Sequence, residues 1–182
     1  IHGKPLASCG KGDLRAELAR LARAFDMRVL GYRRSAAPAA GADESFHGQE
    51  LAAMVSRCDF VVNTLPLTPD SARLVDRGVI AAMKATACYI NVGRGGTTDE
   101  AALVEALAAG WIAGAGLDVF ATEPLPPDHP LWKLDNVIIT PHNAGTTEFY
   151  NLRATALFLR NLEAWLHDGT LPFNLVDLEA GY

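Results

Sequence analysis

The sequence predicts an α/β fold in which helices cover a doubly wound, largely parallel sheet. Short apolar runs such as DFVVN (Asp59–Asn63) alternate with amphipathic segments along the chain, which is the pattern of parallel strands joined by helices. The runs show little polar alternation, as expected of strands buried on both faces. In such a sheet the carboxyl ends of the strands share one rim, and ligands bind there.

Each apolar run and each helical period gives one expected element. The expected strands are Lys4–Cys9, Arg28–Tyr32, Asp59–Asn63, Ala87–Val92, Ile112–Leu117 and Asn136–Thr140. The expected helices are a first one with Leu14, Leu18, Leu21, Ala22 and Phe25 on its apolar face, then Gln49–Ser56, Arg77–Lys84, Asp99–Ala109 and Thr147–His167. Ser35–Gly48 is rich in Ala, Gly and Pro and predicts a loop. We expect a dinucleotide-binding domain over residues 1–168 and a C-terminal tail over residues 169–182.

Length and composition indicate one ordinary globular domain. The chain has 182 residues, of which 49% are hydrophobic and 20% are charged. With 16 basic and 21 acidic residues the formal net charge is −5, so we expect neither a nucleic acid nor a membrane as partner. Cys9, Cys58 and Cys88 each adjoin an apolar stretch, which suits free thiols in a reducing cytoplasm. No spacing of Cys and His predicts a metal site.

Candidate catalytic groups stand just beyond the ends of different expected strands. These groups are Arg94, the carboxylates Asp118 and Glu123, and His142. A guanidinium grips a carboxylate bidentately, and a carboxylate beside an imidazole favours the protonated ring. A 2-keto acid needs both, because its carboxylate needs a cation and its carbonyl oxygen needs a proton as a hydride reaches the carbon. The alternative is that Arg94 bonds a nearby carbonyl, Glu123 is solvated and His142 only shapes a turn.

The first expected strand leads into a glycine turn and a helix, the order of a dinucleotide-binding unit. In that unit the turn amides and the helix N-terminus hold a pyrophosphate, so Gly10, Gly12 and Leu14 are candidate cofactor-binding residues. Arg15 replaces the third glycine, which normally lets helix and strand pack closely. We expect this side chain to push the helix N-terminus away from the pyrophosphate and Asp13 to repel a phosphate. Tight binding would instead make Arg15 a phosphate ligand.

The end of the second expected strand carries the signal for cofactor choice. An Asp or Glu there would bond the ribose 2′-hydroxyl of NAD, but the chain offers Arg33, Arg34 and Ser35. Two guanidiniums and a hydroxyl suit a 2′-phosphate, so the sequence favours NADP over NAD. The alternative is a pair of solvated arginines.

Several long stretches resemble the NAD(P)-binding domain of the D-isomer-specific 2-hydroxyacid dehydrogenases, the family of glyoxylate, hydroxypyruvate and phosphoglycerate dehydrogenases. The matching stretches are LPLTPDSARLVDRGVIAAMK from Leu65, INVGRGG from Ile90, ALVEALAAGWIAGAGLDVFATEPL from Ala102 and PLWKLDNVIITPHNAGTT from Pro130. The resemblance covers the whole chain and implies a Rossmann-type domain. It also implies that the family's N-terminal substrate domain is lacking here, and that the full-length form is a homodimer.

The resemblance also implies roles for individual residues. Arg94 would bind the substrate carboxylate, Glu123 would be the acidic partner, and His142 would be the acid/base. Asp118 would face the nicotinamide carboxamide, and Thr64 to Pro66 would line the cofactor.

Two functions are consistent with these features. The first is an oxidoreductase that transfers a hydride between NAD(P)H and a small 2-keto acid such as glyoxylate or hydroxypyruvate. The second is a nucleotide-binding module without turnover, either a damaged site or a truncated part of such an enzyme. Arg94, Glu123 and His142 favour the enzyme, and Arg15 favours the binding module.

Overall fold

The computed structural model describes residues 1–10, 13–34 and 37–178. Its contacts divide the chain into two compact units, Ile1–His142 and Asn143–Tyr182, and we describe each by itself. The domain boundary predicted at residue 168 stays a prediction.

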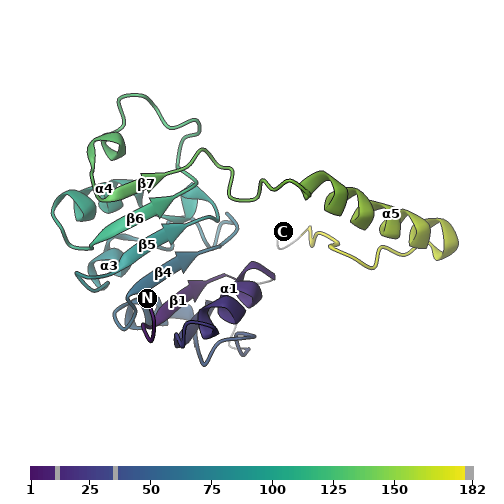
Figure 1. Cartoon of the computed structure of the whole chain (residues 1–182), viewed down its shortest axis with the longest axis horizontal. Coiled ribbons are helices and arrows are strands. Elements are labelled where there is room, and N and C mark those ends of the chain that lie inside the picture. The colour runs from purple at the N-terminus through teal and green to yellow at the C-terminus, as the bar shows by residue number, and fades with distance from the viewer. Residues whose placement is uncertain (11–12, 35–36, 179–182) are drawn as a thin grey trace. The chain divides into compact units, whose positions relative to one another are not determined.

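Within the described residues, the first unit contains a seven-stranded sheet (Figure 1). The strands run in the order β3-β2-β1-β4-β5-β6-β7, and every neighbouring pair is parallel. Their bounds are β1 Leu6–Cys9, β2 Val29–Arg33, β3 Glu44–His47, β4 Phe60–Asn63, β5 Cys88–Asn91, β6 Gly114–Leu117 and β7 Val137–Ile139. The predicted doubly wound parallel fold is confirmed.

Helices cover both faces of this sheet. Their bounds are α1 Asp13–Arg23, α2 Leu51–Val55, α3 Arg77–Ala81 and α4 Glu100–Ala108, with short 3-10 turns at Gly48–Glu50, Gly95–Thr97 and Pro130–Lys133. Strand residues alternate between the faces. Leu6 and Val29 pack with residues of α1, whereas Ala7 and Leu30 join the larger core beneath α2, α3 and α4.

The strand register sets where the loops emerge. Cys9, Asn63, Asn91 and Leu117, the last residues of four strands, are Cα partners across β1, β4, β5 and β6. The loops that follow them therefore leave the sheet along one rim, as parallel strands require.

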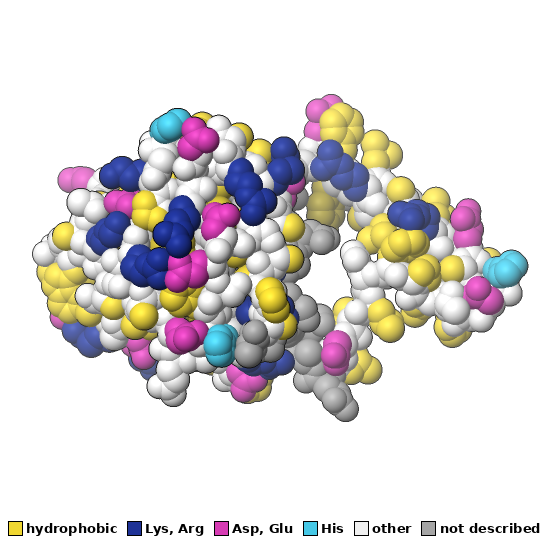
Figure 2. Space-filling view, turned by 90° about the horizontal axis from the view of Figure 1, so that it is seen from below, with side chains coloured by type: hydrophobic (Ala, Val, Ile, Leu, Met, Phe, Trp, Pro, Cys, Tyr) yellow, Lys and Arg dark blue, Asp and Glu magenta, His cyan; other side chains and the backbone are white. Residues whose placement is uncertain are grey.

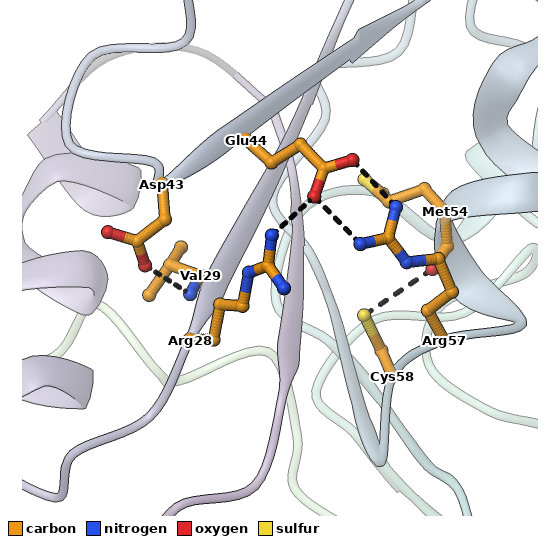
Figure 3. Close-up of polar contacts among 7 residues, drawn as sticks. All are labelled: Arg28, Val29, Asp43, Glu44, Met54, Arg57 and Cys58. Atoms are coloured by element: carbon orange, nitrogen blue, oxygen red, sulfur yellow. Dashed lines mark hydrogen bonds and ion pairs between the residues drawn. The ribbon is translucent and has the colours of Figure 1, made fainter.

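Strand β3 corrects the sequence prediction, which gave Ser35–Gly48 as a loop. The strand is short and lies at the sheet edge, and of its four residues only Phe46 is buried, so its sequence has no apolar run to mark it. Side chains stabilise it instead (Figure 3): Glu44 accepts from Arg28 at 2.8 Å and from both terminal nitrogens of Arg57 at 2.6 and 2.7 Å. Asp43, just before the strand, accepts from the Val29 amide at 2.8 Å.

The prediction that the larger apolar residues of the first helix face the core is wrong for three of them. Leu14, Leu21 and Phe25 are exposed, whereas Ala19 and Ala22 are buried. Together with Arg15 these alanines follow a spacing of four and three residues, so they share one side of the helix. Small side chains let α1 approach β1 and β2, whereas Leu14 and Leu21 face outward and Leu18 is partly buried against the same core.

The three cysteines are free, as predicted. Cys9 and Cys58 are buried and Cys88 is partly buried. Burial raises the pKa of the Cys9 thiol to about 12 and that of Cys58 to about 11, so both stay protonated and unreactive at neutral pH.

The second unit consists of α5 (Tyr150–Asp168) and the segment after it. Gly169 ends the helix in a left-handed conformation, with φ 76°, at the predicted place. The tail folds back on the helix, because Asn161 exchanges two hydrogen bonds with the Phe173 backbone at 2.9 and 3.0 Å. Hydrophobic side chains gather on this unit, at the right of Figure 2, and Leu152, Phe158 and Trp165 are among them. None of the helices in the described residues has the length and hydropathy of a membrane span.

We expect Ile80→Ala to lower the free energy of unfolding by about 2–5 kcal/mol, because Ile80 on α3 is fully buried in the larger core. The matched control is Ile138→Ala on β7, where the side chain is 73% exposed and the loss is about 1 kcal/mol or less. Denaturant titrations of both variants measure the difference. Equal losses would contradict the described core.

Candidate active site

A buried hydrogen-bond network lies beneath the rim. Asn63 at the end of β4 donates to Tyr89 Oη and Thr97 Oγ1, each at 2.9 Å. The Tyr89 hydroxyl lies 2.6 Å from Thr98 Oγ1. Burial raises the pKa of Tyr89, so its hydroxyl stays protonated and can bond. The network ties two strands to the loop after β5.

The same asparagines shape the loops that follow their strands. Asn63 Oδ1 accepts from the Leu65 amide at 3.0 Å, and Asn91 Oδ1 accepts from the Gly93 amide at 3.0 Å. Thr97 Oγ1 donates to the Arg94 carbonyl at 2.6 Å. The sequence analysis did not predict these positioning residues, although both buried runs, DFVVN and YIN, end in Asn.

Arg94 stands on the loop after β5, with an exposed side chain. One of its nitrogens, Nη1, donates to the Gly93 carbonyl at 2.7 Å, so the carbonyl bond of the alternative interpretation does form. That bond uses one N–H, and in the described residues the guanidinium has no acidic partner. Next to it, a Cβ added at Gly95 would lie 2.0 Å from the Phe120 carbonyl oxygen. The Arg94 loop is therefore pressed against the loop that leads to Glu123.

Glu123 and His142 are in direct contact. His142 Nδ1 and Glu123 Oε2 are 2.6 Å apart, and Glu123 Oε1 accepts from the Phe120 amide at 3.0 Å. Burial opposes ionisation of Glu123, but the hydrogen bonds from Phe120 and His142, with the charges of His142 and Arg94, lower its pKa below the ordinary value. The ionised carboxylate accepts, so the ring carries its proton on Nδ1 and leaves Nε2 for chemistry.

Local backbone geometry turns His142 toward Glu123. The residue has φ 51°, in the left-handed region that His adopts more readily than most residues, and its amide donates to the Thr140 carbonyl at 3.1 Å. A cavity of about 610 Å³ borders the pair, with Phe120, Leu125 and Trp132 among its walls. Both side chains of the pair are partly exposed, His142 by 46% and Glu123 by 34%, so a small molecule can reach them.

Asp118 closes β6 and is 4% exposed. Its Oδ1 accepts from the Thr140 hydroxyl at 2.5 Å, and its amide donates to the Asn91 carbonyl at 3.0 Å. These bonds fix a carboxylate between the ends of β5 and β7. Asp118 is therefore positioned at the rim, as the sequence predicted.

Gly10 and Thr64 meet at the ends of β1 and β4. Thr64 donates from its amide and its hydroxyl to the Cys9 carbonyl, at 2.8 and 3.0 Å. Gly10 has φ 140°, and a Cβ there would lie 2.2 Å from Thr64 Oγ1. Only glycine fits there, because a larger residue would overlap Thr64. The Gly10 amide donates to the Tyr32 carbonyl at 3.3 Å, and its carbonyl accepts from Arg15. Pro66 follows and is partly buried, and the carbonyl of Pro66 accepts from the Ser71 hydroxyl at 2.6 Å.

The remaining predicted cofactor residues lie around the ends of β1 and β2. Arg33 is partly buried and donates to the Pro38 carbonyl at 2.9 Å, whereas Arg34 is exposed and pairs with Asp70 at 2.5 Å. Leu14 lies exposed in the first turn of α1. Gly12 and Ser35 lie outside the described residues.

Arg15 is buried, and its expected effect on the helix N-terminus stays a prediction. The residue is 4% exposed, its Nη1 donates to the Gly10 carbonyl at 2.8 Å, and α1 still packs on the sheet through Ala19 and Ala22. The side chain lies along the helix toward the glycine turn.

Ion pairing separates two classes of arginine in the first unit. Figure 2 shows Lys and Arg side chains beside Asp and Glu over the molecular surface. Within the described residues, the arginines paired with carboxylates are Arg20, Arg23, Arg28, Arg34, Arg57, Arg73 and Arg77. Arg15, Arg33 and Arg94 make no such pair in that part of the chain, and each lies near a strand end. These three arginines therefore have N–H groups that no carboxylate of the described residues binds.

Sequence comparison identifies relatives over almost the whole chain. The family model described as D-isomer specific 2-hydroxyacid dehydrogenase, NAD binding domain, matches residues 1–144. A glyoxylate reductase of Korarchaeum cryptofilum is 37% identical over 179 residues, which is 98% of this chain and 54% of the relative. A glyoxylate reductase of Pyrococcus furiosus is 38% identical over 180 residues, or 98% of this chain and 53% of the relative. The chain spans about half the length of such curated relatives.

Solved structures give the same result. A D-isomer specific 2-hydroxyacid dehydrogenase from Xanthobacter autotrophicus, in complex with NADPH and MES, superposes with a TM-score of 0.88 at 36% identity, over 98% of this chain and 73% of that one. An NADPH-dependent glyoxylate/hydroxypyruvate reductase from Sinorhizobium meliloti, in complex with NADP and sulfate, has a TM-score of 0.88 at 32% identity, over 100% of this chain and 58% of that one.

We expect Gly95→Ala to destabilise the chain by about 3 kcal/mol, because its Cβ would overlap the Phe120 backbone and push the loops that carry Arg94 and Glu123 apart. Gly96→Ala is the matched control, since its Cβ would meet only the Leu67 side chain, at 3.1 Å. Thermal unfolding of both variants measures the difference. If Gly95→Ala were as stable as Gly96→Ala, the described approach of the loops would be wrong.

Proposed function

This chain belongs to the D-isomer-specific 2-hydroxyacid dehydrogenase family, and on that premise we propose that it forms the nucleotide-binding half of an oxidoreductase for small 2-keto acids of the glyoxylate or hydroxypyruvate class. The observation that carries the proposal is the 2.6 Å contact between His142 and Glu123, within range of the Arg94 charge. A proton donor and a carboxylate-binding cation are the two groups that such a substrate needs.

The proposed roles follow from the contacts of each side chain. The nicotinamide, when bound, supplies a hydride to the substrate carbonyl carbon. His142 gives its proton from Nε2 to the carbonyl oxygen, while Glu123 on Nδ1 holds the ring and stabilises its charged form. Arg94 grips the substrate carboxylate with its free N–H groups, and the loop hydrogen bonds beneath hold its backbone in place.

Chain residues suited to the dinucleotide are Gly10, Gly12, Leu14, Thr64, Pro66 and Asp118. Gly10 supports the assignment best, because its close contact with Thr64 admits only glycine in the turn that follows β1. Arg33, Arg34 and Ser35 stand where NAD-specific proteins carry an acid, so we infer a preference for NADP. The NADPH and NADP in the two similar structures support this inference.

A dinucleotide-binding module without turnover is the second candidate. The observation that favours it is Arg15 in the position of the third glycine. Turnover in a hybrid that joins the amino-terminal half of the Pyrococcus furiosus glyoxylate reductase to this chain would exclude this candidate.

Two further proposals concern the setting of the protein. The free thiols of Cys9 and Cys58 support a cytoplasmic location. The family resemblance supports a homodimer of the full-length form.

We expect His142→Asn to lower turnover of glyoxylate by about 100-fold or more, as for the loss of a general acid. Asn tolerates φ 51° and its amide can still bond Glu123, so the variant removes Nε2 with little backbone strain. NADPH oxidation is followed in the hybrid protein, and dinucleotide binding by the same variant serves as the control. Normal turnover with normal binding would refute the acid/base role.

We expect Arg33→Gln to weaken NADPH binding by about 10-fold to 100-fold and to leave NADH binding within about 2-fold, because a charge-assisted bond to the 2′-phosphate is lost. Arg28→Gln is the matched control, because it makes the same charge change at the opposite end of β2, where the side chain pairs with Glu44. It is expected to leave the ratio of NADPH affinity to NADH affinity unchanged. Calorimetric titration of both cofactors decides between these outcomes. If the ratio of NADPH affinity to NADH affinity were unchanged in Arg33→Gln, Arg33 would have no contact with the 2′-phosphate.

A further inference from the structure

Arg15 is a buried cation whose one described partner is neutral. The residue is 4% exposed, and its hydrogen bond goes to the Gly10 carbonyl. Its Nε is buried and has no hydrogen-bond partner in the described part of the chain. Burial lowers the pKa of Arg15, and the nearby charge of Arg33 lowers it further. The Gly10 amide in turn donates to the Tyr32 carbonyl at 3.3 Å, one residue before Arg33, so both arginines lie at the paired ends of β1 and β2.

Arg33 repeats the pattern at the end of β2. One nitrogen bonds the Pro38 carbonyl, and its Nε is likewise buried without a partner. A buried unpaired cation is costly, and a second cation beside it adds to the cost. An anion bound by the two guanidiniums would offset the charge of both cations.

The position of these groups indicates which anion they fit. Arg15 lies in the first turn of α1, an 11-residue helix whose positive dipole end faces the rim. Arg33 ends the strand that meets the adenosine ribose in dinucleotide-binding folds, where the 2′ substituent is read. Because Arg15 bonds Gly10, which is itself bonded to the end of β2, its guanidinium lies by the strand end that carries Arg33.

We propose that Arg15 and Arg33 jointly bind the 2′-phosphate of NADP, so that Arg15 selects the phosphorylated dinucleotide instead of blocking the turn. This inference rests on the proposed function, since it needs a dinucleotide at this rim. It makes Arg15 a specificity-determining residue, in a position where dinucleotide-binding turns carry glycine.

The test titrates NADPH, NADH, adenosine 2′,5′-bisphosphate and AMP into the full chain by calorimetry. We expect Arg15→Met to weaken NADPH and the bisphosphate by about 10-fold to 100-fold, with NADH and AMP changed by less than about 2-fold. Arg15→Lys keeps the charge but not the planar fork, so its loss is expected to be smaller. The matched control is Arg20→Gln, which removes a charge from the same helix at a site paired with Glu17.

The outcomes separate this inference from the proposed function. If the wild type binds both dinucleotides and Arg15→Met leaves NADPH affinity unchanged or raises it, Arg15 is no phosphate ligand and only this inference fails. Equal losses for NADPH and NADH would overturn it too, because the contact would then be to a phosphate that both cofactors share. A wild type that binds neither dinucleotide would overturn the proposed function and this inference together.

A stability measurement distinguishes a ligand residue from a structural one. We expect Arg15→Met to raise the Tm of the free chain by about 2–4 °C, because it removes an uncompensated buried charge. If Arg15 instead stabilised the fold through its bond to Gly10, Arg15→Met would lower the Tm. For NADPH binding, the double variant Arg15→Met/Arg33→Gln is expected to lose less than the product of the single losses, because both groups serve one phosphate. If the affinity loss of the double variant equalled the product of the two single losses, the two arginines would act at separate sites.

Discussion

The hydrogen bonds of Asn63 and Asn91 beneath the strand ends are the constraint on which the candidate site depends. Each side chain bonds the backbone of the loop after its own strand. The two are linked because Asn63 donates to the Tyr89 hydroxyl, which bonds Thr98 Oγ1, and Asn91 donates to the same Thr98 oxygen. In the interior such bonds are strong when satisfied and costly when broken, so they specify one loop arrangement. The parallel register brings both asparagines to the same level of the sheet. The geometry around Arg94 follows from these two facts.

The candidate site also contains arginines that make no ion pair. Within the described residues Arg15, Arg33 and Arg94 have no carboxylate partner, whereas Arg34, also at the end of β2, pairs with Asp70. Under the proposed function, Arg15 and Arg33 would bind the phosphate side of a dinucleotide and Arg94 would bind a substrate carboxylate.

Acid/base chemistry requires a further alignment, across the loops after β6 and β7. Glu123 is held by the Phe120 amide, and His142 is turned toward it by a left-handed backbone. Gly95 lets the Arg94 loop approach the same segment. Three separate strands therefore contribute to one site, which explains why its residues are far apart in the sequence.

By itself the sequence determined the alternation of strands and helices, the parallel sheet and the candidates Arg94, Glu123 and His142, because buried strands need apolar runs and their polar ends stand out against them. It did not reveal β3, whose pairing depends on side chains brought from other elements, or the buried face of α1, where small residues pack better than the periodic leucines. The tertiary structure also decided the environment of Arg15. In the sequence Arg15 only replaces the third glycine of the motif. In the folded chain it is a buried cation without an acidic partner, because only folding removes its water and brings Gly10 and Arg33 near it.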